Sequence, residues 1–188
     1  MRLQSVALAN VLPQPWKNGG GVTRELLAWP EPACWRVRLS VAEVTADGPF
    51  SRFEGVQRWF AVLQGDGVRL TVDDAMTELR GADAPLGFSG EAATHCALLG
   101  GPTRDFNLML RGATGALKRL NGADEATVIA TNLIAVYAAS ARAEVHFGSE
   151  TCLLERGCLG WAVADAPTRV ALRGPDLLWA CLALEDSP

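Results

Sequence analysis

Apolar and polar residues alternate in short runs along much of the chain, and glycine, proline or Asp-Gly interrupts these runs at strand-like intervals. In residues 36–44, RVRLSVAEV, Val37, Leu39 and Val41 fall on one face of an extended segment, and Arg38, Ser40 and Ala42 fall on the other. Residues 105–111, DFNLMLR, place their phenylalanine and leucines on one face and Asn107 on the opposite one. This period of two predicts β-strands with one buried face.

Residues 58–72, RWFAVLQGDGVRLTV, contain two β-rich runs on either side of Gly65-Asp66-Gly67. This arrangement predicts a tight β-hairpin.

The second half also has short apolar runs separated by turn residues, but the pattern is weaker there. Residues 135–143 are rich in alanine, but Val136 and Tyr137 favour a strand over a helix. Residues 112–127 are the best candidate for a connection between two halves. Many short strands at even spacing predict an all-β barrel or sandwich, built either as two barrels or as one long jelly roll.

The composition excludes some partners. Among 188 residues, 17 are basic and 21 acidic, which gives a net charge of −4 and no basic excess to bind nucleic acid. No apolar run approaches the ~18 residues of a membrane span. The N-terminal residues are too often interrupted by polar side chains to form a signal peptide, so we expect a cytoplasmic protein.

The sequence gives little evidence for a metal site or a catalytic nucleophile. The five cysteines show no CxxC spacing and are expected to be free thiols. His95 and His146 are far apart and form no HxH motif, so no metal or other cofactor is expected. Ser40 or Cys96 beside His95 is conceivable as a nucleophile, but no GxSxG elbow is present.

Residues 15–25, PWKNGGGVTRE, place three glycines between Lys17 and Arg24. One interpretation is an anion cradle, in which the two cations and glycine N–H groups surround a carboxylate. The other is a tight chain reversal, in which Trp16 plugs the end of a barrel and the glycines only permit close packing. The lysine precedes the glycines, so this is not a Walker phosphate loop.

The polar strand faces leave a similar choice. The polar side chains of both strands either face solvent or line a cavity: Arg38 and Ser40 in the first, and Asp105, Asn107 and Arg111 in the second. The same choice applies to Arg58. An arginine, asparagine and serine lining suits a small dicarboxylate, whose charges need paired donors when they lose water.

Four blocks of sequence, PWKNGGGVTRE, DGPFSRFEGVQRWFAVLQGDGVRL, PLGFSGE and GPTRDFNLMLR, resemble the ordered motifs of the HutD/Ves family. The resemblance covers roughly residues 13–111 and weakens after 112. It implies a cupin-like (RmlC-like jelly roll) bicupin with two stacked β-barrels, residues 1–112 and 113–188, between which strands can be exchanged. The sequence departs from the family pattern at Val37, Glu54 and Gln57, which we expect near the rim of the pocket.

The resemblance also implies a function. HutD proteins are associated with histidine utilisation and with binding of formylglutamate, Ves proteins with cold or stress responses, and no catalytic activity is established for the family. It therefore predicts a non-catalytic protein that binds a small acidic metabolite such as formylglutamate and regulates histidine utilisation. The alternatives are a metal-free cupin isomerase or hydrolase acting on a small carboxylated substrate, and an interaction scaffold with a vestigial pocket.

The expected partners are thus a small acidic metabolite, with no nucleic acid and no membrane, in a chain that allows a homodimer. The predicted ligand-binding residues are Trp16, Lys17, Asn18, Arg24, Arg38, Ser40, Arg58, Asn107 and Met109.

Overall fold

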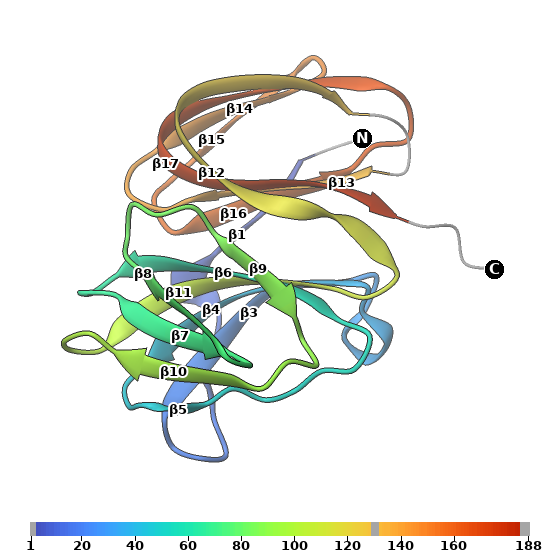
Figure 1. The fold of residues 1–188 in the computed structure, drawn as a ribbon. Coiled ribbons are helices and arrows are strands. Elements are labelled where there is room, and N and C mark those ends of the chain that lie inside the picture. The colour runs from blue at the N-terminus through green and yellow to red at the C-terminus, as the bar shows by residue number, and fades with distance from the viewer. Residues whose placement is uncertain (1–2, 129–131, 185–188) are drawn as a thin grey trace. The chain divides into compact units, whose positions relative to one another are not determined.

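The computed structural model describes residues 3–128 and 132–184, which divide into two compact units (Figure 1). Residues 11–111 form the N-terminal unit, and the rest of the described chain forms the C-terminal unit. The described residues contain strands and two short 3-10 helices but no α-helix, which confirms the all-β prediction. None of their helices is long and apolar enough to cross a membrane.

Two antiparallel sheets make the N-terminal unit, in the orders β2-β3-β4-β11-β6-β9 and β5-β10-β7-β8. Its elements are β2 (Gln14–Pro15), β3 (Gly21–Trp29), η2 (Pro32–Cys34), β4 (Val37–Val44), β5 (Gly48–Pro49), β6 (Gln57–Gln64), β7 (Val68–Val72), β8 (Ala75–Leu79), β9 (Leu86–Ser89), β10 (Thr94–Leu98) and β11 (Thr103–Leu110).

A core of apolar side chains holds these two sheets together. It takes Val44, Phe60 and Val62 from the six-stranded sheet, and Leu70 and Cys96 from the four-stranded one. All of these are almost fully buried, so the two inner faces pack as in a β-sandwich.

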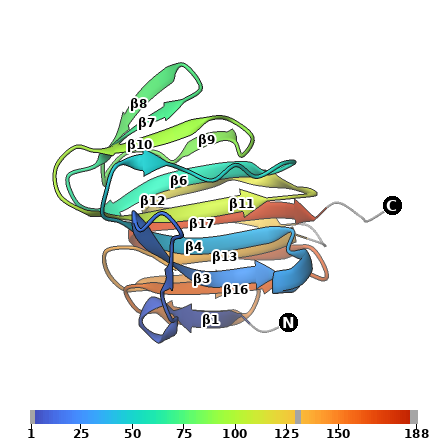
Figure 2. The same ribbon diagram turned by 90° about the horizontal axis from the view of Figure 1, so that it is seen from below.

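The C-terminal unit is one antiparallel sheet that curls on itself (Figure 1), in the order β1-β16-β13-β17-β14-β15 with β12 also paired to β17. Its elements are β1 (Gln4–Ala7), η1 (Leu8–Asn10), β12 (Ala113–Val128), β13 (Asn132–Ala138), β14 (Ala143–Phe147), β15 (Glu150–Leu154), β16 (Cys158–Val163) and β17 (Thr168–Leu184). Figure 2 shows β1 beside β16, so the first strand of the chain joins the sheet of the second half.

Residues 135–138 lie in a fully buried strand, β13, as their β-branched and aromatic residues predicted. The expected connection at 112–127 was wrong, because most of it forms β12, a strand of 16 residues. It pairs with β17 along nearly its whole length, and Gly122 marks a shift in register. Partner strands thus override the weak strand propensity of its glycines and alanines.

The predicted hairpin at residues 58–72 was also wrong. β6 pairs with β11 and β9, whereas β7 pairs with β10 and β8 in the other sheet. Gly65 and Gly67 have φ of 98° and 109°, a backbone conformation that L-residues avoid. They let the chain cross from one sheet to the other instead of folding back beside β6.

Gly67→Ala is therefore expected to lower the Tm by roughly 2–12 °C. A non-glycine residue held in such a conformation costs about 1–3 kcal/mol, and each kcal/mol shifts Tm by about 2–4 °C in a chain of this size. A Cβ at Gly67 would also lie 2.5 Å from the Leu79 carbonyl oxygen. Thermal unfolding beside Gly81→Ala, where a Cβ meets no atom within 4 Å, provides the comparison. Equal Tm values for the two variants would contradict the strain argument.

Candidate ligand-binding site

The polar face of the six-stranded sheet is built by residue pairing across β4, β11 and β6. Met109 of β11 lies between Arg38 of β4 and Arg58 of β6, and Asn107 lies beside Ser40 in the next row. Residues two apart on a strand point to the same side, so these five side chains share one face. The face is turned into the unit, where its rows meet a cavity.

The cavity has a volume of about 560 Å³, within the usual range for small-molecule sites. All the predicted ligand-binding residues except Arg24 line it. The lining consists of Gln14, Pro15, Trp16, Lys17, Asn18, Thr23, Arg38, Ser40, Ala42, Pro49, Phe50, Ser51, Phe53, Arg58, Phe60, Asn107 and Met109.

Arg58 is the most buried cation of this lining, with 5% of its surface exposed. Its Nη2 donates to Asn107 Oδ1 at 3.3 Å and its Nη1 to the Ser51 carbonyl oxygen at 3.4 Å, both long contacts. Its buried Nε has no hydrogen-bond partner, and no carboxylate in the described part of the chain forms an ion pair with it. Arg58 is therefore a desolvated cation that lacks a counterion among the described residues.

Three phenylalanine rings hold the Arg58 guanidinium in place. Its carbon lies 5.3 Å from the centroid of Phe50, 5.7 Å from Phe53 and 5.1 Å from Phe88. Burial, and then the nearby charge of Arg38, lower the pKa of Arg58 to about 10. At neutral pH the guanidinium remains charged, and an anion beside it would offset the cost of desolvation.

Arg38 differs from Arg58 because it has a counterion. Its Nε donates to Glu25 Oε2 at 2.6 Å, and its Nη1 lies 3.9 Å from Met109 Sδ. Both side chains of the ion pair are partly exposed, at 19% for Arg38 and 24% for Glu25. The cavity thus contains two arginines in the same row. The charge of Arg38 is balanced by a carboxylate, and that of Arg58 is not balanced by any described residue.

The glycine-rich stretch makes a tight turn ahead of β3. Gly19 has φ of 73°, and its N–H donates to the Trp16 carbonyl oxygen at 3.1 Å. The Gly20 N–H donates to Asn18 Oδ1, and a Cβ at Gly21 would lie 2.3 Å from the Glu43 carbonyl oxygen. The amides of Gly19 and Gly20 are therefore used within the loop, which favours the chain-reversal interpretation over an anion cradle of glycine N–H groups.

The side chains around this turn reach the cavity even though its amides do not. The Trp16 indole donates to Thr23 Oγ1 at 2.7 Å and packs edge-to-face on Phe50, with centroids 6.2 Å apart. Lys17 and Asn18 are exposed and lie at the cavity's edge. The turn thus provides an aromatic wall and an exposed cationic rim.

Arg24 does not reach the cavity. It follows Thr23, which lines the cavity, so the alternation of β3 turns Arg24 to the opposite side of the sheet. There its Nη1 donates to Glu43 Oε1 at 2.6 Å, and Arg104 contacts the same carboxylate oxygen at 3.0 Å. The structure gives Arg24 an ion-pair partner away from the other predicted residues.

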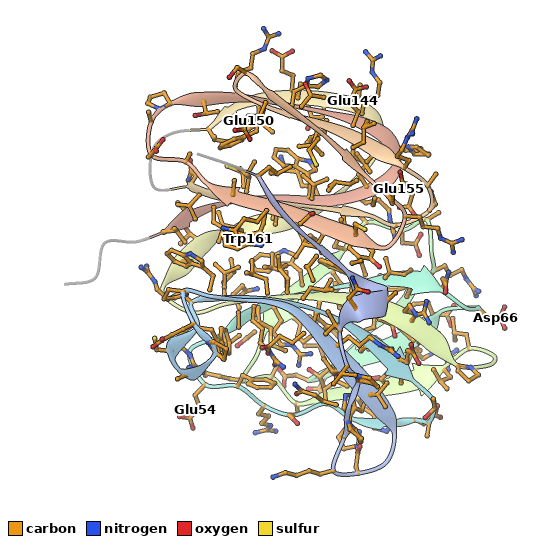
Figure 3. The ribbon with its side chains drawn as sticks, turned by 180° about the vertical axis from the view of Figure 1, so that it is seen from behind. Glu54, Asp66, Glu144, Glu150, Glu155 and Trp161 are labelled. Atoms are coloured by element: carbon orange, nitrogen blue, oxygen red, sulfur yellow. The ribbon has the colours of Figure 1, made fainter. Side chains whose placement is uncertain are left out.

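The departures from the family pattern also lie off the cavity lining. Glu54 is exposed and points away from the unit in Figure 3, and Gln57 is exposed too. Val37 is fully buried on the face of β4 opposite to Arg38. The expected place near the rim was wrong for Val37, whereas Glu54 and Gln57 are neighbours in the chain of Phe53 and Arg58, which line the cavity.

Asp105 is a buried acid in the row next to Asn107, with no exposed surface. Thr103 Oγ1 donates to its Oδ2 at 2.7 Å, whereas its buried Oδ1 has no hydrogen-bond partner. Burial raises the pKa of Asp105 to about 7, against the Thr103 hydrogen bond, which lowers it. Burial first, and then the charges of Asp105 and Asp47, raise the pKa of Cys96 to about 12. The sequence left Asp105 a choice between solvent and a lined interior, and the structure buries it.

The histidines lie apart, His95 on β10 and His146 on β14. Residues 3–128 and 132–184 contain no group of three metal-ligating side chains of the His, Cys, Asp or Glu type. His146 instead contacts Glu144 at 2.8 Å and Thr151 at 3.0 Å on the exposed surface of its sheet.

The fold is that of a cupin-type β-protein. A likeness to the oxalate decarboxylase of Lactobacillus farciminis covers 97% of this chain and 86% of that one, with a TM-score of 0.68 and 9% identity. The HutD family model matches residues 9–180, and the chain belongs to the HutD family.

Two solved structures extend this comparison over nearly the whole chain. A conserved protein of unknown function from Pseudomonas aeruginosa PAO1 is 30% identical, with a TM-score of 0.84 over 97% of this chain and 99% of that one. HutD from Pseudomonas fluorescens SBW25 is 28% identical, with a TM-score of 0.83 over 97% and 98%.

Curated relatives match over a shorter stretch. An uncharacterized 21.2 kDa protein in the hutC 3′ region of Pseudomonas putida is 45% identical over 106 residues, 50% of this chain and 51% of the relative. Protein Ves of Escherichia fergusonii is 35% identical over 99 residues, 51% of each. The chain thus spans about half the length of the curated relatives it matches.

Proposed function

We propose that this cavity binds a small carboxylated metabolite, with formylglutamate as the specific candidate, and that the protein acts by binding rather than by catalysis. The observation that carries the proposal is Arg58, a buried guanidinium in the wall of an open cavity, with no counterion in the part of the chain that the structure describes. Such a group gains more from an anionic ligand than a solvated cation does, because its loss of water is already complete.

The remaining lining fits the rest of such a ligand. Asn107, which contacts Arg58, and Ser40 beside Asn107 offer an amide and a hydroxyl, which suit a formamide or second polar group. Trp16 and Phe50 give an apolar wall for a short aliphatic chain. A second carboxylate would reach towards Lys17 at the exposed rim, where water and salt weaken the attraction.

The biological role proposed for the site is regulation of histidine utilisation. Membership of the HutD family supports it, as does the naming of a 45% identical relative after its position beside hutC. In this role the protein would respond to the concentration of a carboxylated intermediate of histidine utilisation. Binding of this intermediate in the cavity would change the regulatory state of the protein.

Calorimetric titration tests the binding directly. Formylglutamate is expected to bind the wild-type protein, and its uncharged diamide is expected to show no measurable binding under the same conditions. The diamide has nearly the same shape, so a difference between the two isolates the carboxylate charges. Equal heats for the two compounds, or none for either, would refute the proposed recognition of formylglutamate.

A further inference from the structure

Glu25 lies on the cavity side of β3, although it is absent from the cavity lining. Thr23, two residues earlier, lines the cavity, and Glu25 is paired in register with Ser40, which also lines it. A strand irregularity follows at once, between Glu25 and Leu27. Its extra residue brings Ala28 opposite Arg38, so Glu25 sits diagonally across from the guanidinium with which it pairs.

The pairing leaves the two arginines of the row electrically different. The charge of Arg38 is balanced by Glu25 at 2.6 Å, whereas Arg58 has no carboxylate partner among the described residues. Among the residues that the structure describes, no aspartate or glutamate lines the cavity. A ligand carboxylate next to Arg38 would therefore lie close to the negative charge of Glu25, and one next to Arg58 would not.

The contact also fixes which atoms Arg38 presents. Glu25 accepts the hydrogen bond from Nε, and Nη1 contacts the sulfur of Met109, which lines the cavity, so the Nη edge of the guanidinium lies on the cavity side. That edge remains able to donate to a carbonyl or hydroxyl oxygen, which brings no charge to repel Glu25.

We propose that Glu25 determines how many carboxylates the interior of the cavity accepts: it balances Arg38, so that one carboxylate binds at Arg58 and a neutral amide or hydroxyl group binds beside Arg38. This inference rests on the proposed function and makes Glu25 a specificity-determining residue that acts through Arg38. The preferred ligands are acids with a single carboxylate held deep in the cavity, while any second one remains at the solvated rim.

The test compares formylglutamate with its two half-amides, N-formylglutamine and N-formylisoglutamine, each of which keeps one carboxylate. For the wild-type protein, the tighter half-amide is expected to bind with a Kd within about tenfold of that of formylglutamate. Glu25→Gln keeps an oxygen that accepts the Arg38 Nε–H but removes the charge. It is expected to shift the preference towards formylglutamate by about tenfold, since a like charge has been taken from a partly desolvated site.

Glu78→Gln is the matched control, because Glu78 forms an exposed ion pair with Arg69 away from the cavity. It should leave the ratio of the Kd values unchanged. A wild-type protein that binds both half-amides more than about tenfold more weakly than formylglutamate would overturn the inference, even if Glu25→Gln fails to fold. An unchanged ratio in folded Glu25→Gln would overturn it as well, while the proposed function stands. Absence of binding for all three compounds would refute both.

Discussion

Arg58→Met is expected to weaken the binding of formylglutamate by about thirtyfold to several thousandfold. Removing one partner of a buried charge pair costs roughly 2–5 kcal/mol, which corresponds to that range. Methionine has a similar length and fits among Phe50, Phe53 and Phe88, so it removes the charge with little loss of packing. Calorimetric titration of wild type and variant measures the ratio of the two Kd values.

The Tm of the unliganded variant separates a binding role from a structural one. Because the charged guanidinium is desolvated without a counterion, its replacement by an apolar side chain should leave the Tm unchanged or raise it. Arg24→Met is the matched control, since Arg24 pairs with Glu43 outside the cavity. This variant should bind formylglutamate with the same Kd as the wild-type protein. A large fall in Tm with unchanged affinity for Arg58→Met would make Arg58 a structural residue instead.

Asp105→Asn is expected to stabilise the protein more at pH 8 than at pH 5. An acid whose pKa rises from 3.8 to about 7 on folding contributes stability that is fully present below 3.8 and is lost as pH rises through 7. Above that pH the buried carboxyl must ionise, with one oxygen lacking a hydrogen bond. Asparagine stays neutral and keeps an oxygen for the Thr103 hydroxyl.

The size of this effect follows from the pKa shift. Between pH 5 and pH 8 the wild-type protein is expected to lose ~2–3 kcal/mol through Asp105 alone, and the variant should lose none of it. Urea unfolding at both pH values gives the double difference, in which pH effects from other groups cancel. Asp124→Asn serves as a control because Asp124 lies in the C-terminal unit and is only partly buried. A double difference near zero would show that Asp105 is not an ionising buried group.

The strand faces were predictable because alternation is a local property. Arg38, Ser40 and Asn107 stand at alternate positions in regular strands, and the structure keeps this pattern inside the unit. The same reasoning could have placed Arg24, which is one residue from Thr23 and so faces the other way. The sequence motif grouped it with Lys17 by proximity along the chain, which is a poor guide within a strand.

Pairing between distant strands was beyond the reach of these local patterns. The Gly65–Gly67 turn has the residues of a hairpin, but β6 and β7 pair in different sheets, and these sheets pack against each other through the core. Likewise, the partner of Arg38 depends on a strand irregularity after Glu25, and the lack of a partner for Arg58 depends on the surrounding phenylalanines. Alternation could identify the arginines, whereas their different charge environments needed the three-dimensional arrangement.

A crystal structure of the protein with formylglutamate is the most direct test of the central claim that the cavity is a carboxylate site. One carboxylate is expected within ~3 Å of the Arg58 Nη atoms, with the aliphatic chain against Trp16 and Phe50. Density for the ligand elsewhere on the protein, or in the cavity with no carboxylate oxygen near Arg58, would contradict it.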